Sequence, residues 1–484
     1  MSDRLPAQDL QVLALESSTT PMHNMTLEIF EPGETGFDYE TLVEHIRDRI
    51  AYVPRYRQRI RSVPGRLANP VWVDDADFDL AFHVRRSALP RPGNLEQLRE
   101  LTARIASRRL DFERPLWEVY FVEGLEQGRV AVLSKSHEIL VDGVSTVDLG
   151  QVLLDVDPSL RMVVHEDWAP RPEPSSTGLV TGAVRDSLLN PGLAAVTARS
   201  NAAAATRAVA GAAGKAVHVA NALSNRRSHP DSPFNIDPSA QRRVLCVRTS
   251  LKDYRKVRRA HGGTVNDVIL ATITGAIRSW LMTRAEPIHN GSRLKALVPM
   301  SVIDEELEPT SLGSQVIAHL VNLPIGEASP VVRLHQVSYA LRAHSETGKA
   351  VAADKIAGVA GFAPTTFHAL GSRLAAKDDH NVNLIITNVP GPQFPMYLAG
   401  AEMVATYPIP PLHPGFSMSI GVTSYDGGVY YGITADRDAL PDIEVLGQCV
   451  TEALEELTFT ASEMRQRARR GSKAVQKVLP KKDS

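Results

Sequence analysis

A histidine and two carboxylates lie within one short segment at the end of an alternating apolar run. The run from Val130 to Leu133 leads into Ser134–Gly143, which contains His137, Glu138 and Asp142. The Asp-Gly dipeptide that ends this segment interrupts regular structure, so we expect a strand to deliver these side chains to a turn. Imidazole and carboxylate groups offer general acid–base catalysis. A strand end that carries solvated charges is the competing interpretation of the same residues.

Several common catalytic motifs are absent from the sequence. It contains no GxSxG elbow, Walker loop, GxGxxG fingerprint or HExxH zinc helix. His137 and Glu138 do not begin an HExxH motif, because Val141 stands where the second histidine would be. The sequence therefore gives no motif that would indicate a serine hydrolase, a phosphoryl-transfer enzyme, a dehydrogenase or a zinc peptidase.

Composition indicates an ordinary globular protein without a metal or disulfide framework. The chain has 484 residues, of which 43% are hydrophobic and 22% are charged, and its formal net charge is −2. Bulk charge therefore gives no reason to expect nucleic acid as a partner. Its two cysteines, Cys246 and Cys449, have no metal-ligand spacing. We predict no metal site from these residues.

Charge is distributed unevenly, because the end of the chain is basic. Residues 465–484 hold eight Lys or Arg and one Asp, which leaves 45 basic and 54 acidic residues in the remainder, a net charge of −9. Such a tail could contact an anionic membrane or lipid droplet, or it could serve only as a solubilising tail. The start of the chain has no apolar leader, and no uncharged apolar run reaches ~18 residues. We therefore expect a cytoplasmic protein, peripheral on the inner membrane or on lipid droplets.

Hydrophobic periodicity supplies the elements that would position the histidine segment. Apolar residues at helical spacing predict helices over Tyr39–Ala51 and Leu95–Arg109, and another is expected over Val144–Leu154. Alternation predicts paired strands over Trp117–Val122 and Val130–His137. Trp117 itself is expected to lie in the core.

The second half repeats this mixture of strands and helices. Thr264-Val265-Asn266-Asp267 contains a cap residue just before an apolar helix over Val268–Leu281. Asp426-Gly427-Gly428 predicts a hairpin, and Asn388 to Pro392 is expected to break the buried strand Asn381–Thr387. The remaining predictions are strands over Val244–Thr249, Leu294–Pro299 and Gly313–Leu323, and helices over Lys252–Ala260, Pro330–Ala343 and Asp442–Leu457.

Together these elements predict an α/β or α+β fold with two domains. We assign residues 1–166 to the first domain and 244–463 to the second, with a basic tail over 464–484. Residues 167–243 form a proline- and alanine-rich linker that we expect to be partly helical, and an interfacial membrane helix is the alternative.

Motifs spread along the chain resemble one known family, the bacterial wax ester synthase/diacylglycerol acyltransferases, within the superfamily of CoA-dependent acyltransferases. The resemblance extends from Leu10 to about Leu457. Each motif alone is weak, but their shared order is specific. The motifs are Pro21-Met22-His23, Pro54-Arg55-Tyr56-Arg57-Gln58-Arg59, Pro115-Leu116-Trp117-Glu118, Asp142-Gly143, Thr264-Val265-Asn266-Asp267, Val298-Pro299, Thr387-Asn388-Val389-Pro390-Gly391-Pro392 and Tyr397-Leu398-Ala399-Gly400.

The resemblance implies two similar chloramphenicol-acetyltransferase-like domains, each a mixed sheet flanked by helices, with a tunnel at their interface. Long-chain acyl-CoA would enter as a substrate, with no cofactor, and diacylglycerol or a long-chain alcohol would accept the acyl group. A base in the tunnel would deprotonate the hydroxyl, which would attack the thioester without a covalent enzyme intermediate.

The family pattern also implies roles for individual residues. Asp142 would orient the loop, and Gly143 would let backbone and substrate approach closely. Asn266 would donate to the oxyanion or position substrate together with Asp267, and helix capping is the competing role.

The histidine segment departs from the family pattern His-His-x-x-x-Asp-Gly. The second histidine, which serves as the base in the family, corresponds to Glu138 here, and only His137 remains. Glu138 could be the base, because an apolar tunnel raises a carboxyl pKa. His137 could serve instead, but only if a kink turns it toward the tunnel. The third interpretation is a catalytically silent relative that binds acyl-CoA or lipid.

Overall fold

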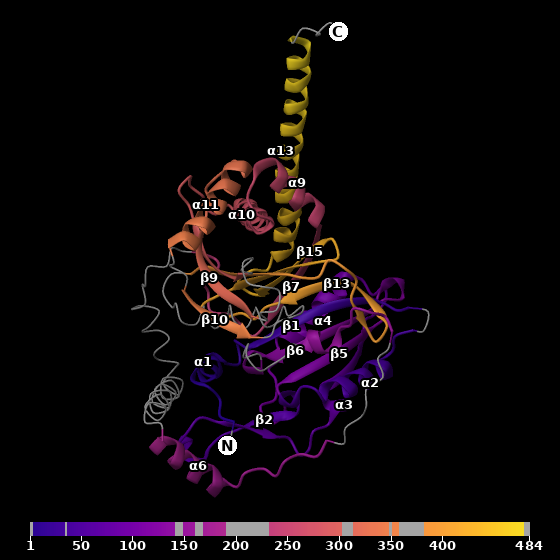
Figure 1. Cartoon of the computed structure of the whole chain (residues 1–484), viewed down its shortest axis with the longest axis vertical. Coiled ribbons are helices and arrows are strands. Elements are labelled where there is room, and N and C mark those ends of the chain that lie inside the picture. Colours follow the sequence, from indigo (N-terminus) through magenta and orange to yellow (C-terminus); the bar gives the residue numbers. More distant parts are fainter. Residues whose placement is uncertain are drawn as a thin grey trace, which may run out of the picture.

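Two mixed β-sheets, each flanked by helices, organise the molecule (Figure 1). The structure is a computed structural model, and it describes residues 3–33, 36–140, 149–159, 168–189, 232–302, 313–347, 351–357 and 382–478. The expected α/β architecture with two sheets is confirmed.

The first sheet carries the histidine segment on a central strand. Its order is β12-β13-β1-β6-β5-β4, and β6 lies between β1 and β5, antiparallel to both. In sequence order the strands are β1 (His23–Glu31), β4 (Val84–Ala88), β5 (Trp117–Glu123), β6 (Val130–His137), β12 (Tyr397–Leu398) and β13 (Ala401–Ile409). A separate ribbon pairs β2 (Gln58–Arg61) with β3 (Val71–Asp74).

The first half of the chain contains both α-helices and short 3₁₀ turns. A capping box begins α4, in which Asn94 and Gln97 satisfy each other's backbone N–H groups. The helices are α1 (Ala7–Leu15), α2 (Tyr39–Ile50), α3 (Leu80–His83), α4 (Leu95–Ala106), α5 (Leu149–Leu153) and α6 (Ser176–Leu189), with 3₁₀ turns η1 (Pro54–Arg57), η2 (Pro64–Arg66), η3 (Glu126–Gly128) and η4 (Glu138–Leu140).

The second sheet has the order β10-β9-β8-β11-β14-β15-β7. Its strands are β7 (Arg242–Ser250), β8 (Leu294–Val302), β9 (Gly313–Leu323), β10 (Val351–Ala357), β11 (Leu384–Pro390), β14 (Met418–Tyr425) and β15 (Gly428–Asp436). The predicted hairpin joins β14 to β15, with Tyr425 opposite Gly428. Helices α9 (Leu251–His261), α10 (Val265–Thr283), α11 (Pro330–Thr347) and α13 (Ile443–Val478) flank this sheet, and α13 extends beyond it as a long projection (Figure 1).

One strand end was predicted wrongly. Asn388 does not break β11, because the strand continues to Pro390 in parallel register with β14, where Asn388 faces Val422. Pro390 is the last residue of the strand.

The two sheets do not correspond to two contiguous halves of the sequence. Residues 397–409, which the predicted boundaries place in the second domain, form β12 and β13 of the first sheet, and β13 pairs with β1 along most of its length. The same core therefore holds Leu27 and Met25 of β1 and Met403 of β13. The proposed domain boundaries remain a prediction. Residues 397–409, here called the exchanged segment, lie within the predicted second domain but belong to the first sheet.

Backbone contact between β13 and β15 fixes the approach of the two sheets. A Cβ atom on Gly432 would lie 1.7 Å from the carbonyl oxygen of Pro408. At that distance the two atoms would clash, so only glycine permits this close approach of the two backbones. The predicted Trp117 core position is also confirmed, since its side chain is fully buried and its Nε1–H donates to the Tyr56 carbonyl at 2.7 Å.

Other predictions fall partly outside the described residues. Of the helix expected over 144–154, residues 149–153 are described, and they form α5. Most of the predicted linker, including its alanine-rich part, lies outside the described residues, as do Asp142 and Gly143.

Candidate active site

The end of β6 places His137 and Glu138 in the protein interior. His137 is the last residue of the strand, and Glu138 begins the 3₁₀ turn η4, so strand alternation stops between them. Both side chains are buried, at 1% and 0% exposure. The chain direction is fixed by two backbone bonds, from His137 N–H to the Leu116 carbonyl and from Glu138 N–H to the Met22 carbonyl.

Both ring nitrogens of His137 form hydrogen bonds within the fold. Nδ1 accepts the Ile139 backbone N–H at 3.2 Å, which places the ring proton on Nε2. Nε2 then donates to Glu16 Oε2 at 2.7 Å. The ring also lies edge-on to Phe112, with centroids 5.6 Å apart. In this arrangement His137 holds the turn and has no nitrogen left to accept a proton from a substrate.

Glu16 was not identified from the sequence, and it is the partner that fixes His137. It is the C-cap residue of α1, and Oε1 accepts from Arg109 Nε at 2.9 Å. Burial alone would raise the pKa of Glu16, but the His137 and Arg109 contacts outweigh it and lower this pKa. The ionised carboxylate is therefore the form that the fold stabilises. No spacing rule connects Glu16 to a residue 121 positions further along the chain.

Two further buried bases lie beside His137 on the first sheet. His23 of β1 is directly opposite His137, and its Nε2 lies 3.0 Å from the carbonyl oxygen of Ala106. Lys135 Nζ donates to the carbonyls of Arg108 and Ile105 at the end of α4. Burial lowers the pKa of Lys135 to about 8 and that of His23 well below its usual value. Both residues anchor α4 to the sheet.

Asp267 has a structural role at the start of α10. Its Oδ2 accepts the Thr264 backbone N–H at 2.9 Å and the Ser338 hydroxyl at 2.6 Å. Thr264 Oγ1 accepts the Asp267 N–H at 3.1 Å, which completes a capping box. Asp267 is thus committed to the helix end and to its contact with α11.

Asn266 is positioned by a residue whose role the sequence did not indicate. Asn388 Nδ2 of β11 donates to Asn266 Oδ1 at 2.6 Å. Because the carbonyl oxygen faces β11, the amide –NH₂ of Asn266 is oriented away from that strand. Asn388 belongs to a motif that was quoted for the family but interpreted only as a strand break. An asparagine within a buried strand was the signal available.

His137, Glu138, Asn266 and Asp267 thus form two separate groups, at the end of β6 and at the start of α10. Glu138 is a buried carboxylate that can accept a proton, and Asn266 is an oriented amide that can donate to an oxyanion. Among the described residues, no group of three His, Cys, Asp or Glu side chains could hold a metal ion.

The fold and these groups define the class of protein. Two helix-flanked mixed sheets carry a histidine–carboxylate segment on one and an asparagine at a helix N-terminus on the other. Residues 5–269 match the wax ester synthase/diacylglycerol acyltransferase catalytic domain, and residues 312–458 match the C-terminal domain of the same family. The chain belongs to the wax ester synthase/diacylglycerol acyltransferase family, which confirms the resemblance seen in the sequence.

Curated relatives carry names consistent with that family. A probable diacylglycerol O-acyltransferase of Mycobacterium tuberculosis is 42% identical over 262 residues, which is 53% of this chain and 96% of the relative. Another from the same organism is 32% identical over 439 residues, covering 90% of this chain and 91% of the relative.

Solved structures show the same fold. The wax ester synthase/diacylglycerol acyltransferase from Marinobacter aquaeolei VT8 aligns over 95% of this chain and all of its own, with 26% identity and a TM-score of 0.64. The first condensation domain of the CDA synthetase shares the fold at a TM-score of 0.53 and 13% identity. In the described part of this chain, no helix combines the length and apolar character that a membrane crossing requires.

Proposed function

We propose that this protein transfers a long-chain acyl group from acyl-CoA to the hydroxyl of diacylglycerol, of a long-chain alcohol, or of both. Membership of the family and the names of its relatives support this activity. The resemblance implies a tunnel between the two sheets that would bring the substrates together. The basic end of the chain would hold the protein at an anionic membrane or lipid droplet.

Glu138 is the proposed base. The observation that carries this choice is the engagement of both His137 nitrogens, by Glu16 and by the Ile139 N–H. Glu138 occupies the position at which the family pattern places its base, and its carboxylate is fully buried. It would take the hydroxyl proton as the oxygen attacks the thioester carbonyl, and return that proton to the departing CoA thiolate.

Asn266 is the proposed donor to the tetrahedral oxyanion. Its amide is held by Asn388, so the –NH₂ group needs no reorganisation as charge develops. A preorganised donor of this kind typically contributes about 10²–10³-fold in rate.

Thiol release from long-chain acyl-CoA, with and without an acceptor, tests the role of Glu138. We expect native protein to release CoA only when diacylglycerol or fatty alcohol is present. Glu138→Gln has nearly the same shape but no basic oxygen, and it should lower the rate about 10²–10⁴-fold. His137→Gln is the matched variant, and it should retain more activity because its ring is not the proton acceptor.

A silent acyl-CoA- or lipid-binding relative is the alternative function, and the engagement of His137 also favours it if Glu138 cannot serve as a base. If native protein and Glu138→Ala are equally inactive while Glu138→His gains turnover, the enzyme proposal fails and the binding proposal stands. If instead only His137→Gln abolishes activity, Glu138 is not the base.

A further inference from the structure

A short turn, residues 17–20, lies in the chain between the two groups that hold His137 and Glu138. It begins directly after Glu16, which accepts the hydrogen bond from His137. The carbonyl of Met22, two residues after the turn, accepts the Glu138 N–H at 3.0 Å. A displacement of the 17–20 turn would therefore act on both residues at the end of β6.

The 17–20 turn is closed by its own hydrogen bonds. The backbones of Ser17 and Thr20 exchange two bonds of 3.3 Å, and the hydroxyl groups of the same residues lie 2.7 Å apart. The Thr20 hydroxyl also donates to the Leu15 carbonyl at 3.1 Å. The carbonyl of Thr19 is the group through which this closed turn contacts the second sheet.

Arg242, the first residue of β7, makes that contact. Its Nη2 donates to the Thr19 carbonyl, and its Nη1 donates to the Ser239 carbonyl at 2.6 Å. The carboxylate of Asp436 lies 3.7 Å from the guanidinium, and both side chains are 2% exposed. Asp436 in turn accepts from the Ser239 N–H and hydroxyl at 2.6 and 2.7 Å. The guanidinium is thus fixed on the second sheet and extends to the chain that leads into β1.

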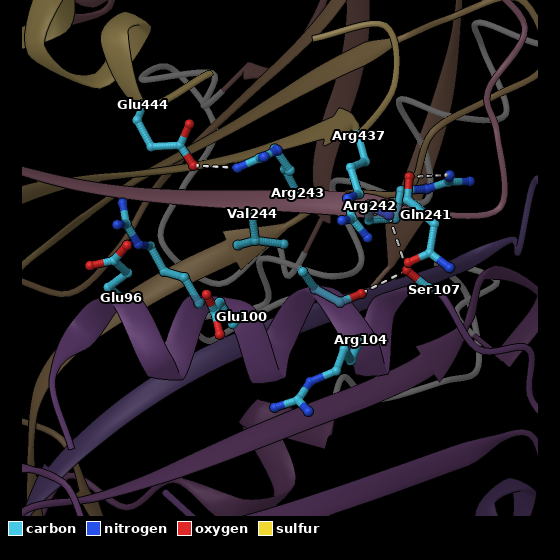
Figure 2. A pocket seen from close by; sticks show the side chains of 12 residues that line it. Glu96, Glu100, Arg104, Ser107, Gln241, Arg242, Arg243, Val244, Arg437 and Glu444 are labelled. Atoms are coloured by element: carbon cyan, nitrogen blue, oxygen red, sulfur yellow. Dashed lines mark hydrogen bonds and ion pairs between the residues drawn. The ribbon is translucent and has the colours of Figure 1, made fainter. Parts of the chain in front are cut away.

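The backbone of Arg242 makes a second contact with the first layer. Its N–H donates at 3.1 Å to Oγ of Ser107, the C-cap residue of α4. Figure 2 shows this contact in a charged pocket of about 320 Å³ between α4 and β7, which arginines and glutamates line. Arg242 therefore contacts the first layer at two places, through its backbone at α4 and through its side chain at the 17–20 turn.

We infer that Arg242 is a positioning residue for the proposed acyl transfer and that it acts through the 17–20 turn. A planar guanidinium holds its donors in a fixed geometry, so the Thr19 carbonyl is located relative to the second sheet. A misplacement of about 1 Å at a reacting group can cost about 10²-fold in rate. The placement of Glu138 would then depend on a residue of the other sheet. This inference rests on the proposed role of Glu138 as the base.

The kinetics of Arg242→Met test this role, because methionine fills much of the space but has no donor. We expect kcat to fall about tenfold or more and the KM for acyl-CoA to change less than about twofold, since the turn places the base. Ser107→Ala is the matched control. It removes the other contact of Arg242 with the first layer, and kcat should stay within about twofold of native.

A double variant tests whether Arg242 acts on Glu138. In a Glu138→Gln background, Arg242→Met should cause little further loss of kcat, because a misplaced base and a missing base lose the same contribution. Losses that simply multiply would overturn the assignment. If Arg242→Met does not fold, Arg242→Lys replaces it. Lysine keeps a charge beside Asp436 but not the planar fork, so the same loss in kcat is expected at smaller size.

The proton on His137 Nε2 gives a measurement that needs no turnover. Its NMR signal in protein with isotope-labelled histidine is assigned by its absence from His137→Gln. We expect slow exchange of this proton with solvent in native protein, because the ring is 1% exposed and bonded to Glu16. Arg242→Met should speed the exchange about tenfold or more by loosening the 17–20 turn, and Ser107→Ala should leave it unchanged.

The proton exchange separates the failure of this assignment from the failure of acyl transfer. If folded Arg242→Met exchanges the His137 proton as slowly as native protein, or if Ser107→Ala matches its effects, the assignment is wrong, whether or not thiol is released. If exchange is faster in Arg242→Met alone while native protein releases no thiol, the turn is positioned by Arg242 and acyl transfer fails. A thermal unfolding curve for each variant confirms that folded proteins are compared.

Discussion

The hydrogen bond from His137 to Glu16 occupies one of the two ring nitrogens of His137. A buried imidazole with one nitrogen on a carboxylate and the other on a backbone N–H is held in a single tautomer and orientation. Its function is then to fix η4, where Glu138 begins. In this arrangement neither ring nitrogen of His137 is left to accept a proton from a substrate.

Replacing Glu16 with glutamine tests this structural role. Glu16→Gln should lower the free energy of unfolding at neutral pH by about 1–3 kcal/mol, because a buried charge-assisted bond becomes a neutral one. Glu44→Gln, on an exposed position of α2, should change it little. Chemical denaturation of the three proteins measures the difference.

The sign of the pH dependence follows from the lowered pKa of Glu16. The stabilisation by the ionised carboxylate is fully present above its unfolded value of about 4.5 and is lost as pH falls through the lower folded pKa. The gap between native protein and Glu16→Gln should therefore narrow in acid. A difference in unfolding free energy that stays constant down to the acid transition would contradict this role for the ionised Glu16 carboxylate.

Residue positions were predicted better from the sequence than residue partners. The burial of Trp117 and the place of His137 and Glu138 at a strand end followed from alternation and from the Asp-Gly break. Glu16 and Asn388 were missed because each acts through a contact between segments more than a hundred residues apart. Local patterns carry no information on such pairs.

At the scale of elements, the start of α10 separates two neighbouring residues that the sequence grouped together. Asp267 closes the capping box and reaches α11 through Ser338, whereas Asn266 is held toward β11 by Asn388. Capping and oxyanion binding were alternatives in the sequence. The structure gives the capping role to Asp267, and Asn266 remains the candidate donor.

Asp267→Ala should therefore act on stability. Loss of the capping-box bond to the Thr264 N–H and of the Ser338 bond should lower the free energy of unfolding by about 1–2 kcal/mol. Asp253→Ala, in the first turn of α9, removes an acid that makes no capping bond and should cost only a few tenths of a kcal/mol. If Asp267→Ala abolishes turnover without loss of stability, Asp267 contacts the substrate instead.

Periodicity predicted most elements but not their assembly into sheets. Amphipathic spacing placed α2 and α4 within a few residues, and the Asp-Gly-Gly turn located the β14–β15 hairpin. The position of β12 and β13 in the first sheet could not be predicted, because the residue pattern of a strand does not determine which other strand it pairs with.

At the scale of the whole molecule, the exchanged strands and Gly432 fix the two sheets against one another. β13 pairs with β1 in one layer, while its Pro408 carbonyl contacts Gly432 of β15 in the other. The candidate site has residues at the end of β6 and at the start of α10, so its geometry depends on this alignment. The charged pocket between α4 and β7 lies along the same junction.

Most of the basic tail belongs to the last part of α13. Figure 1 shows this helix extending past the body of the molecule. Phe459 and Met464, close to the point where the basic stretch begins, are exposed at 65% and 50%. Aromatic and aliphatic side chains beside clustered Lys and Arg are typical of helices that contact anionic lipid.

Removing positive charges from the basic tail should weaken the binding of the protein to anionic vesicles. Each basic residue near an anionic surface contributes about 1 kcal/mol of binding free energy. The combined variant Arg469→Gln, Arg470→Gln and Lys473→Gln should therefore bind the vesicles with about 100-fold lower affinity, as measured by co-sedimentation. A chain truncated after Glu463 should lose more, and binding to neutral vesicles should be weak throughout. The matched control neutralises three exposed bases of α9, Lys252, Arg255 and Arg258. If that control loses binding while the tail variants retain it, the contact surface is α9 and not the tail.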